Sequence, residues 1–135
     1  MSPRVLVVED DDDLREIVCE VLEGAGYEAK AACGGEEALR VLEDPKRPDV
    51  ILLDLTMPGM SGFELRERLL RIPELRSIPT IVMTASRAFD PATLAPAGVL
   101  LKPLDVSQLL EAIDRVLPPE ASGKAPCEVS PRAPS

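Results

Sequence analysis

Short, nearly continuous runs of apolar residues alternate along this chain with segments that have helical spacing. Five such runs are predicted strands, the second being the weakest: Arg4–Val8, Glu28–Ala32, residues 49–54, Thr80–Thr84 and Gly98–Leu101. Continuous Val, Ile and Leu are typical of parallel strands buried on both faces of a sheet. Their alternation with helices predicts an α/β fold, a doubly wound five-stranded parallel sheet.

The first two helices are predicted from apolar spacing and from residues that end helices. Asp12 or Asp13 is the candidate N-cap of the first helix, which is expected to close at Gly24. A short second helix over residues 36–43 cannot extend far, because Pro45 follows it.

Two later helices carry capping signatures. Ser61 and Glu64 have the spacing of a capping box and predict a helix that runs to Ile72. Asp105 and Gln108 have the same spacing and open the last helix of the domain.

The remaining segments set the domain boundaries. Residues 85–97 contain Pro91 and Pro96, which leave room for only a shortened or irregular fourth helix. We expect one domain over residues 1–117. Residues 118–135 are rich in Pro, Ser and Ala and predict a flexible C-terminal tail.

Reactive side chains follow four of the predicted strands, at the point where each strand ends. They are the pair Glu9 and Asp10, then Asp54, Thr84 and Lys102. Ligand sites of parallel sheets gather at the carboxyl ends of the strands, so we expect these side chains to converge on one edge.

That combination has a chemical meaning. Clustered carboxylates can hold a hard divalent cation and leave a lysine and a hydroxyl free to bind phosphoryl oxygens. Without a cation the carboxylates would repel one another, and one of them would keep a proton. A metal and a phosphoryl group are therefore the expected ligands.

Composition narrows the classes of partner. The chain has 135 residues, 45% of them hydrophobic, and a formal charge of -9, which argues against nucleic-acid binding. Arg66, Arg68 and Arg71 spread around one helix and are predicted to lie on a solvated face.

No apolar run reaches membrane-spanning length, and the N-terminus lacks a signal-peptide pattern, so no membrane association is expected.

Cysteine and histidine usage add two constraints. Cys19, Cys33 and Cys127 are odd in number and lack CxxC spacing, which favours a reducing, cytoplasmic environment. The chain has no histidine, which excludes imidazole catalysis, His-ligated zinc and a phosphohistidine on this chain. A phosphoryl group would have to sit on a carboxylate or a hydroxyl.

Taken together and in order, the motifs resemble those of the response-regulator receiver domain of two-component signalling. The matching pieces are VVEDD with Arg15 five residues after Asp10, then DLTMPGMSGFEL, MTAS and LLKPL. The resemblance spans Arg4 to Leu117. It implies a flavodoxin-like sheet with strand order 2-1-3-4-5, an order that the apolar pattern alone does not give.

The resemblance also implies roles for the acidic residues. Asp54 is similar to the phosphoacceptor that becomes 4-aspartylphosphate. Glu9 and Asp10 are similar to the acidic pair that binds Mg²⁺, with Mn²⁺ as a possible substitute. Thr56 would offer its backbone carbonyl to the same ion.

Further positions are expected to respond to the phosphoryl group. Lys102 resembles the lysine that pairs with a phosphoryl oxygen, and Thr84 resembles the hydroxyl that shifts toward it, with the Ala85 backbone amide beside it. Val99 stands where the family commonly has an aromatic residue whose rotamer reports phosphorylation.

The leading hypothesis is a stand-alone, Mg²⁺-dependent phosphoacceptor switch in a phosphorelay. It would take its phosphoryl group from a histidine kinase or a phosphotransfer protein and change a surface that a downstream protein reads, as a monomer or weak dimer. It would catalyse only its own phosphorylation and dephosphorylation.

Two alternatives stay open. One is an interaction module on the same fold that signals without phosphate. The other is a phosphatase of the haloacid-dehalogenase type with an aspartate nucleophile, although that chemistry wants a second acid where this chain has Thr56.

Overall fold

The computed structural model describes residues 3–57, 59–85 and 94–117. Its centre is one parallel sheet with the strand order β2-β1-β3-β4-β5. The strands are β1 (Arg4–Val8), β2 (Glu28–Ala32), β3 (Val50–Asp54), β4 (Thr80–Thr84) and β5 (Gly98–Leu101). The predicted fold class and the strand order implied by the resemblance are both confirmed.

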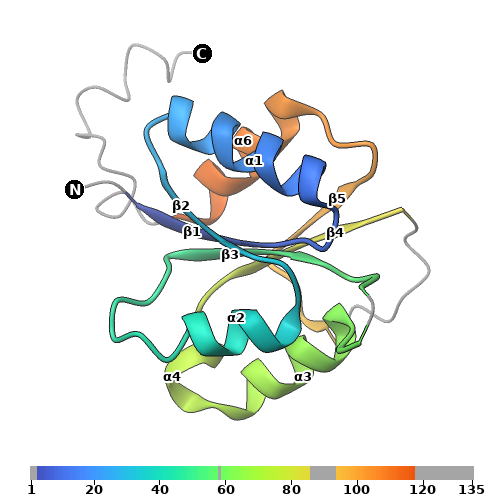
Figure 1. Ribbon diagram of the computed structural model, residues 1–135. Coiled ribbons are helices and arrows are strands. Elements are labelled where there is room, and N and C mark those ends of the chain that lie inside the picture. The colour runs from blue at the N-terminus through green and yellow to red at the C-terminus, as the bar shows by residue number, and fades with distance from the viewer. Residues whose placement is uncertain (1–2, 58, 86–93, 118–135) are drawn as a thin grey trace.

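Helices cover both faces of this sheet (Figure 1). The described helices are α1 (Asp12–Gly24), α2 (Gly35–Val41), α3 (Gly62–Arg71), α4 (Pro73–Arg76) and α6 (Val106–Val116). α1 and α6 lie on one face, and α2, α3 and α4 lie on the other. Each face therefore has its own apolar layer.

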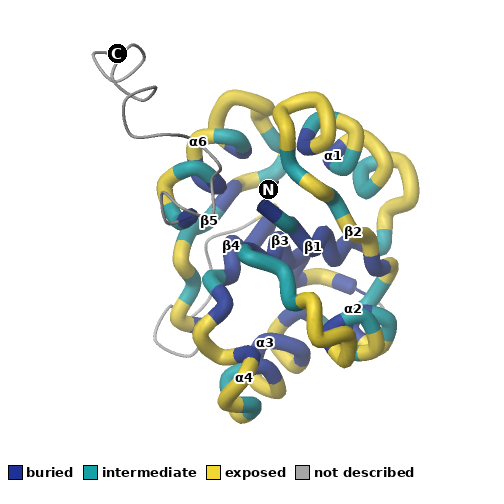
Figure 2. The backbone as a smooth tube through the Cα atoms, turned by 90° about the vertical axis from the view of Figure 1, so that its left-hand side faces the viewer, coloured by how far each residue is buried: buried dark blue, intermediate teal, exposed yellow. Residues whose placement is uncertain are grey.

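The apolar runs form strands because they are buried on both sides. Every residue of β3 and β4 is buried, and β1 is buried after its first residue, whereas β2 and β5 at the edges are partly exposed. Figure 2 shows the same distribution, with dark strands inside and lighter helices outside. Alternate residues of one strand face different layers, as Val5 and Leu6 of β1 do.

Capping residues set where the helices begin. Ser61 accepts a hydrogen bond from the Glu64 amide, and the Glu64 carboxylate accepts one from the Ser61 amide, so the predicted capping box is present. Asp105 caps α6 through the Gln108 amide, as its spacing predicted. The prediction for α1 is wrong by one residue: the N-cap is Asp11, whose carboxylate accepts from the Asp13 and Leu14 amides.

Other boundaries differ slightly from the predicted ones. α2 spans Gly35–Val41 and β3 begins at Val50, each within two residues of its predicted limits. α3 ends at Arg71, and a separate turn of helix, Pro73–Arg76, follows it. Helical spacing did not reveal this turn because four residues are too few to show a period, although Pro73 suits a first helical position.

Two predictions fall mainly or wholly outside the described residues: the irregular helix expected within residues 85–97 and the tail over residues 118–135. In the described part of the chain, no helix is both long and apolar enough to cross a lipid bilayer. Cys19 and Cys33 are free thiols.

Candidate functional site

The carboxyl ends of the strands bring acidic and basic side chains together at one edge of the sheet. Glu9 and Asp10 follow β1, Asp54 ends β3, and Lys102 follows β5. The Lys102 Nζ lies 3.1 Å from Glu9 Oε1 and 3.3 Å from Asp54 Oδ1. One ammonium group thus contacts two carboxylates that come from different strands.

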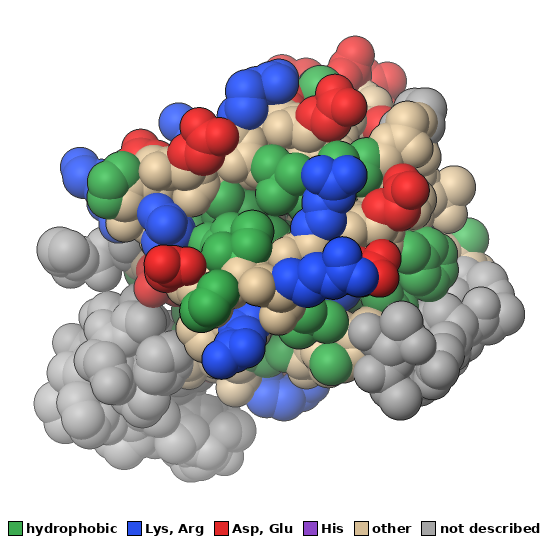
Figure 3. Space-filling view, turned by 90° about the horizontal axis from the view of Figure 1, so that it is seen from below, with side chains coloured by type: hydrophobic (Ala, Val, Ile, Leu, Met, Phe, Trp, Pro, Cys, Tyr) green, Lys and Arg blue, Asp and Glu red, His purple; other side chains and the backbone are tan. Residues whose placement is uncertain are grey.

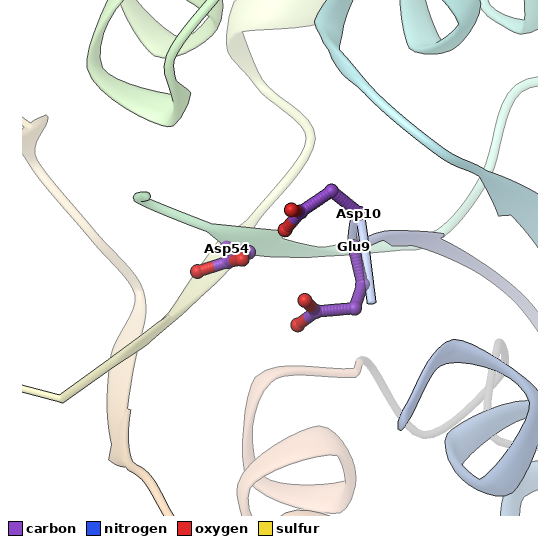
Figure 4. Close-up of side chains that lie close together, drawn as sticks. All are labelled: Glu9, Asp10 and Asp54. Atoms are coloured by element: carbon purple, nitrogen blue, oxygen red, sulfur yellow. The ribbon is translucent and has the colours of Figure 1, made fainter. Parts of the chain in front are cut away.

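Three carboxylates form a compact cluster. Glu9, Asp10 and Asp54 each offer an oxygen, and these oxygens lie within 4.8 Å of one another. Figure 4 shows the Glu9 and Asp10 side chains extending toward the side on which Asp54 lies. Glu9 and Asp54 are only 1% and 2% exposed, whereas Asp10 is half-buried. Water can therefore screen little of the repulsion between the two buried groups.

This environment raises the pKa of Asp54 to about 7. Burial is the largest cause, and the negative charge of Glu9 adds to it, while the Thr56 amide and Lys102 act in the opposite direction. Burial alone would lower the pKa of Lys102, but its hydrogen bond with Glu9 and the charge of Asp54 outweigh that effect and raise it. The lysine therefore stays charged, while Asp54 is easily protonated.

The donor set fits a hard divalent cation such as Mg²⁺. Asp54 Oδ2 is buried and has no hydrogen-bond partner among the described residues. Its other oxygen, Oδ1, accepts from the Thr56 amide at 3.2 Å and contacts Lys102. A buried carboxylate oxygen without a partner is costly, and a cation bound by three clustered carboxylates would satisfy it.

The contact that the structure gives Thr56 is through its N–H, and its side chain is exposed. Thr84 is 7% exposed at the end of β4, and its carbonyl accepts a hydrogen bond from the Lys102 amide at 2.8 Å. Ala85 follows it in an exposed bend. Thr56 thus contacts the carboxylate cluster directly, and Thr84 contacts the backbone of the lysine beside it.

Val99 has a packing role. It is half-buried and packs against Leu55, Val82 and Leu94 on the same side of the sheet as α3. Its short β-branched side chain has essentially one accessible position in such packing. The place expected for a rotating aromatic ring holds a fixed aliphatic contact.

Sequence reasoning assigned no role to two residues that shape the site. The Gly62 amide donates to the Leu55 carbonyl at 3.1 Å, and a Cβ on Gly62 would lie 2.3 Å from the Asp54 carbonyl oxygen. The Arg15 guanidinium donates to the Glu9 carbonyl at 2.8 Å. The available signal was position: both residues lie within the motifs that carry the resemblance.

A groove lies beside the site between α1 and the start of α6. It has a volume of about 470 Å³. Its apolar lining includes Leu14, Ile17, Val21, Leu104 and Val106. Lys102 and Asp11 also line it, so the groove leads directly to the cluster of charged side chains.

Known proteins are similar to this chain in sequence. A family model described as "Response regulator receiver domain" matches residues 5–114. Sporulation initiation phosphotransferase F of Bacillus subtilis is 33% identical over 122 residues, which cover 87% of this chain and 96% of that protein. The phosphate regulon transcriptional regulatory protein PhoB of Pseudomonas aeruginosa is 35% identical over 131 residues, covering 93% of this chain but 57% of PhoB.

The similarity extends to solved structures. The chemotaxis protein CheY4 of Vibrio cholerae superposes with a TM-score of 0.81 at 30% identity, over 87% of this chain and 100% of CheY4. A response regulator receiver protein of Pseudomonas putida superposes with a TM-score of 0.78 at 31% identity, over 85% of this chain and 98% of the other.

Proposed function

Because this chain belongs to the response regulator receiver domains of two-component signalling, we propose that it takes a phosphoryl group onto Asp54 from a partner histidine kinase or phosphotransfer protein. One observation carries the proposal. Asp54 is a buried carboxylate with an unpartnered oxygen, and it contacts a lysine and clusters with two further carboxylates.

The proposed transfer makes one bond and breaks one. An Asp54 oxygen forms a bond to phosphorus, the bond from phosphorus to the donor nitrogen breaks, and its electron pair stays on the donor imidazole. The attacking carboxylate must be ionised, and the raised pKa of Asp54 opposes this. Bound Mg²⁺, held by Glu9, Asp10, Asp54 and the Thr56 carbonyl, would lower that pKa and neutralise charge on the phosphoryl oxygens.

The other residues would bind the transferred group. Lys102 already contacts Asp54 and would pair with a phosphoryl oxygen. The Thr84 hydroxyl and the Ala85 amide would bind the remaining oxygens from the end of β4. Phosphorylation adds roughly two negative charges, enough to change the surface that a downstream protein reads. We place this chemistry in the cytoplasm, and a monomer or weak dimer remains our prediction.

Intact mass after incubation with acetyl phosphate and Mg²⁺ tests the proposal. We expect a gain of one phosphoryl group in the wild-type chain and none in Asp54→Asn, because the amide nitrogen cannot replace the attacking oxygen. Asp13→Asn, which alters an exposed carboxylate of α1, is the matched control and should gain the group normally. Wild-type protein that stays at its starting mass would refute the phosphoacceptor function.

The groove beside the site is suited to the phosphodonor. The exposed surface of α1 is acidic, with Asp12, Asp13, Glu16, Glu20 and Glu23. The opposite face, over α2, α3 and α4, carries Lys and Arg side chains as well as Asp and Glu side chains, among hydrophobic ones (Figure 3). We propose that the donor docks on the α1 side with an amphipathic helix that has basic flanks, which places its phosphoryl group near Asp54.

Ile17→Ser should separate docking from chemistry. Ile17 is 54% exposed and lines the groove, so its loss weakens apolar contact with the donor protein without touching Asp54. We expect phosphotransfer from the donor protein to slow about tenfold, since burying such a side chain contributes roughly 1.5–3 kcal/mol. The measurement compares this rate with uptake from acetyl phosphate, which should not change.

Phe63→Ser is the control for this experiment. Phe63 is also a large exposed apolar residue, at 44%, but it does not line the groove. Equal slowing by both substitutions, or normal transfer to Ile17→Ser, would contradict the proposed docking surface.

A further inference from the structure

Arg66 is a buried cation on α3, in contrast to the solvated position that its sequence predicts. It is 4% exposed, and its three nitrogens all donate hydrogen bonds. Nε donates to the Leu94 carbonyl at 2.7 Å, Nη1 to the Thr80 hydroxyl at 2.9 Å, and Nη2 to the Ala95 carbonyl at 2.9 Å. The prediction is wrong for Arg66 because helical spacing does not show which distant segments of the chain pack against the helix.

The acceptors recorded for Arg66 in the described chain are neutral. Burial lowers the pKa of Arg66, but a guanidinium starts so high that it remains charged. Among the described residues Arg66 has no carboxylate partner, and an apolar side chain at such a buried place usually stabilises a fold as well or better. What the guanidinium offers instead is a rigid, planar set of donors that fixes several acceptors relative to one another.

The fixed acceptors lie at the start of β4 and in the segment that leads into β5. Thr80 begins β4, and its carbonyl accepts from the Ala97 amide at the entry to β5. Ala95 is in a left-handed conformation, with φ at 45°, which is unfavourable for a non-glycine residue. Its hydrogen bond to Arg66 helps to hold this turn.

β5 depends on such support because it is an edge strand. In the sheet it pairs only with β4, and Lys102 follows its last residue. The helix that carries Arg66, α3, begins at Gly62. The Gly62 amide donates a hydrogen bond to the carbonyl of Leu55, the residue after Asp54. Arg66 thus joins the helix that continues from the phosphoacceptor loop to the strand that carries the lysine.

We propose that Arg66 is a positioning residue that acts through β5 to hold Lys102 against Asp54. The inference rests on the phosphoacceptor function proposed above. Replacing Arg66 would leave the fold of the central strands but would loosen the entry to β5. Lys102 would then spend less time in contact with Asp54.

Phosphoryl uptake from acetyl phosphate tests this at a temperature where all variants are folded by circular dichroism. We expect Arg66→Met to slow uptake about tenfold, since small misplacements of positioned groups have effects of this size or larger. Arg68→Met, an exposed arginine on the same helix, should behave as wild type.

A double substitution distinguishes positioning from general destabilisation. If Arg66 acts through Lys102, Arg66→Met should have no further effect on uptake in a Lys102→Met background. Wild-type uptake by Arg66→Met, or effects of the two substitutions that multiply, would overturn the proposal. Should Arg66→Met fail to fold, Thr80→Val removes a single acceptor at nearly constant volume and should show the same dependence on Lys102.

Amide hydrogen exchange keeps the test independent of the proposed function. Arg66→Met should exchange faster at Gly98–Leu101 while β1 keeps its protection. If the wild-type chain accepts no phosphoryl group, the phosphoacceptor function fails, but selective exchange in β5 would still support the link from Arg66 to this strand. Unchanged exchange at β5, or equally faster exchange at β1, would overturn that link.

Discussion

Asp54→Asn should make the metal-free protein more stable at pH 8, by about 2–4 kcal/mol, although it removes the proposed phosphoacceptor. The pKa of Asp54 is raised to about 7, whereas an unfolded aspartate keeps its ordinary value near 3.8. Between these pH values the native carboxyl retains a proton that the unfolded chain loses, so the free energy of unfolding falls as pH rises from about 4 to about 7. An asparagine does not titrate, so the free energy of unfolding of the variant has no such fall.

Urea unfolding followed by circular dichroism at pH 4, 6 and 8 checks this prediction. The advantage of Asp54→Asn should be near zero at pH 4, grow through pH 6 and level off above pH 7. Glu111→Gln, which removes an exposed carboxylate of α6 far from the cluster in sequence, is the control for the loss of one negative charge. A less stable Asp54→Asn protein at pH 8 would contradict the repulsion argument.

Millimolar Mg²⁺ should reduce the difference in stability between the wild-type protein and Asp54→Asn. The wild-type cluster offers three carboxylates, and a bound cation would cancel the repulsion between them. Asp54→Asn lacks one of these ligands and should gain less stability from the ion. A wild-type unfolding curve that ignores Mg²⁺ would refute the proposed metal site.

Gly62→Ala should destabilise the fold by about 3 kcal/mol and impair phosphoryl uptake. The new Cβ would lie 2.3 Å from the Asp54 carbonyl oxygen and 2.6 Å from the Leu55 Cα. Both atoms belong to the backbone, so relief requires the phosphoacceptor loop to move away from α3, and overpacking of this kind costs roughly 1–3 kcal/mol or more. Urea unfolding and the uptake assay measure the two effects.

Gly24→Ala provides the matched control. Gly24 is the last residue of α1, and nothing lies within 4 Å of a Cβ built there. Alanine favours helix, so this variant should be as stable as wild type or slightly more so. Equal stability of Gly62→Ala and Gly24→Ala would contradict the prediction, because it would mean that the loop next to Asp54 can move away from α3 at little cost.

The sequence predicts the sheet well because each buried strand is a single run of contiguous residues, which can be recognised from the sequence. The runs that end at Val8, Asp54 and Thr84 are apolar except at their end residues, and continuous burial on both faces requires that composition. The convergence of Glu9 and Lys102 follows from parallel strands alone, since their carboxyl ends share one edge.

Features that depend on distant segments or on single backbone contacts are not visible in the pattern. Asp11 and Asp12 are both reasonable N-caps, and only the path of the chain after β1 decides between them. Arg66 has the spacing of a surface residue, and its burial depends on acceptors 14 to 29 residues away. The need for glycine at position 62 comes from its approach to Asp54, a contact that no helical period records.

The groove between α1 and α6 has an evolutionary consequence. The groups proposed for the chemistry lie at the carboxyl ends of the strands and in the loops that follow them, whereas Ile17 and Val106 line the groove from helices and are half or more exposed. Substitutions at such helix positions can therefore change which partner is recognised while the phosphoacceptor and its ion site stay intact. After gene duplication, two copies of such a protein can therefore come to recognise different partners while the residues of the phosphoacceptor site stay the same.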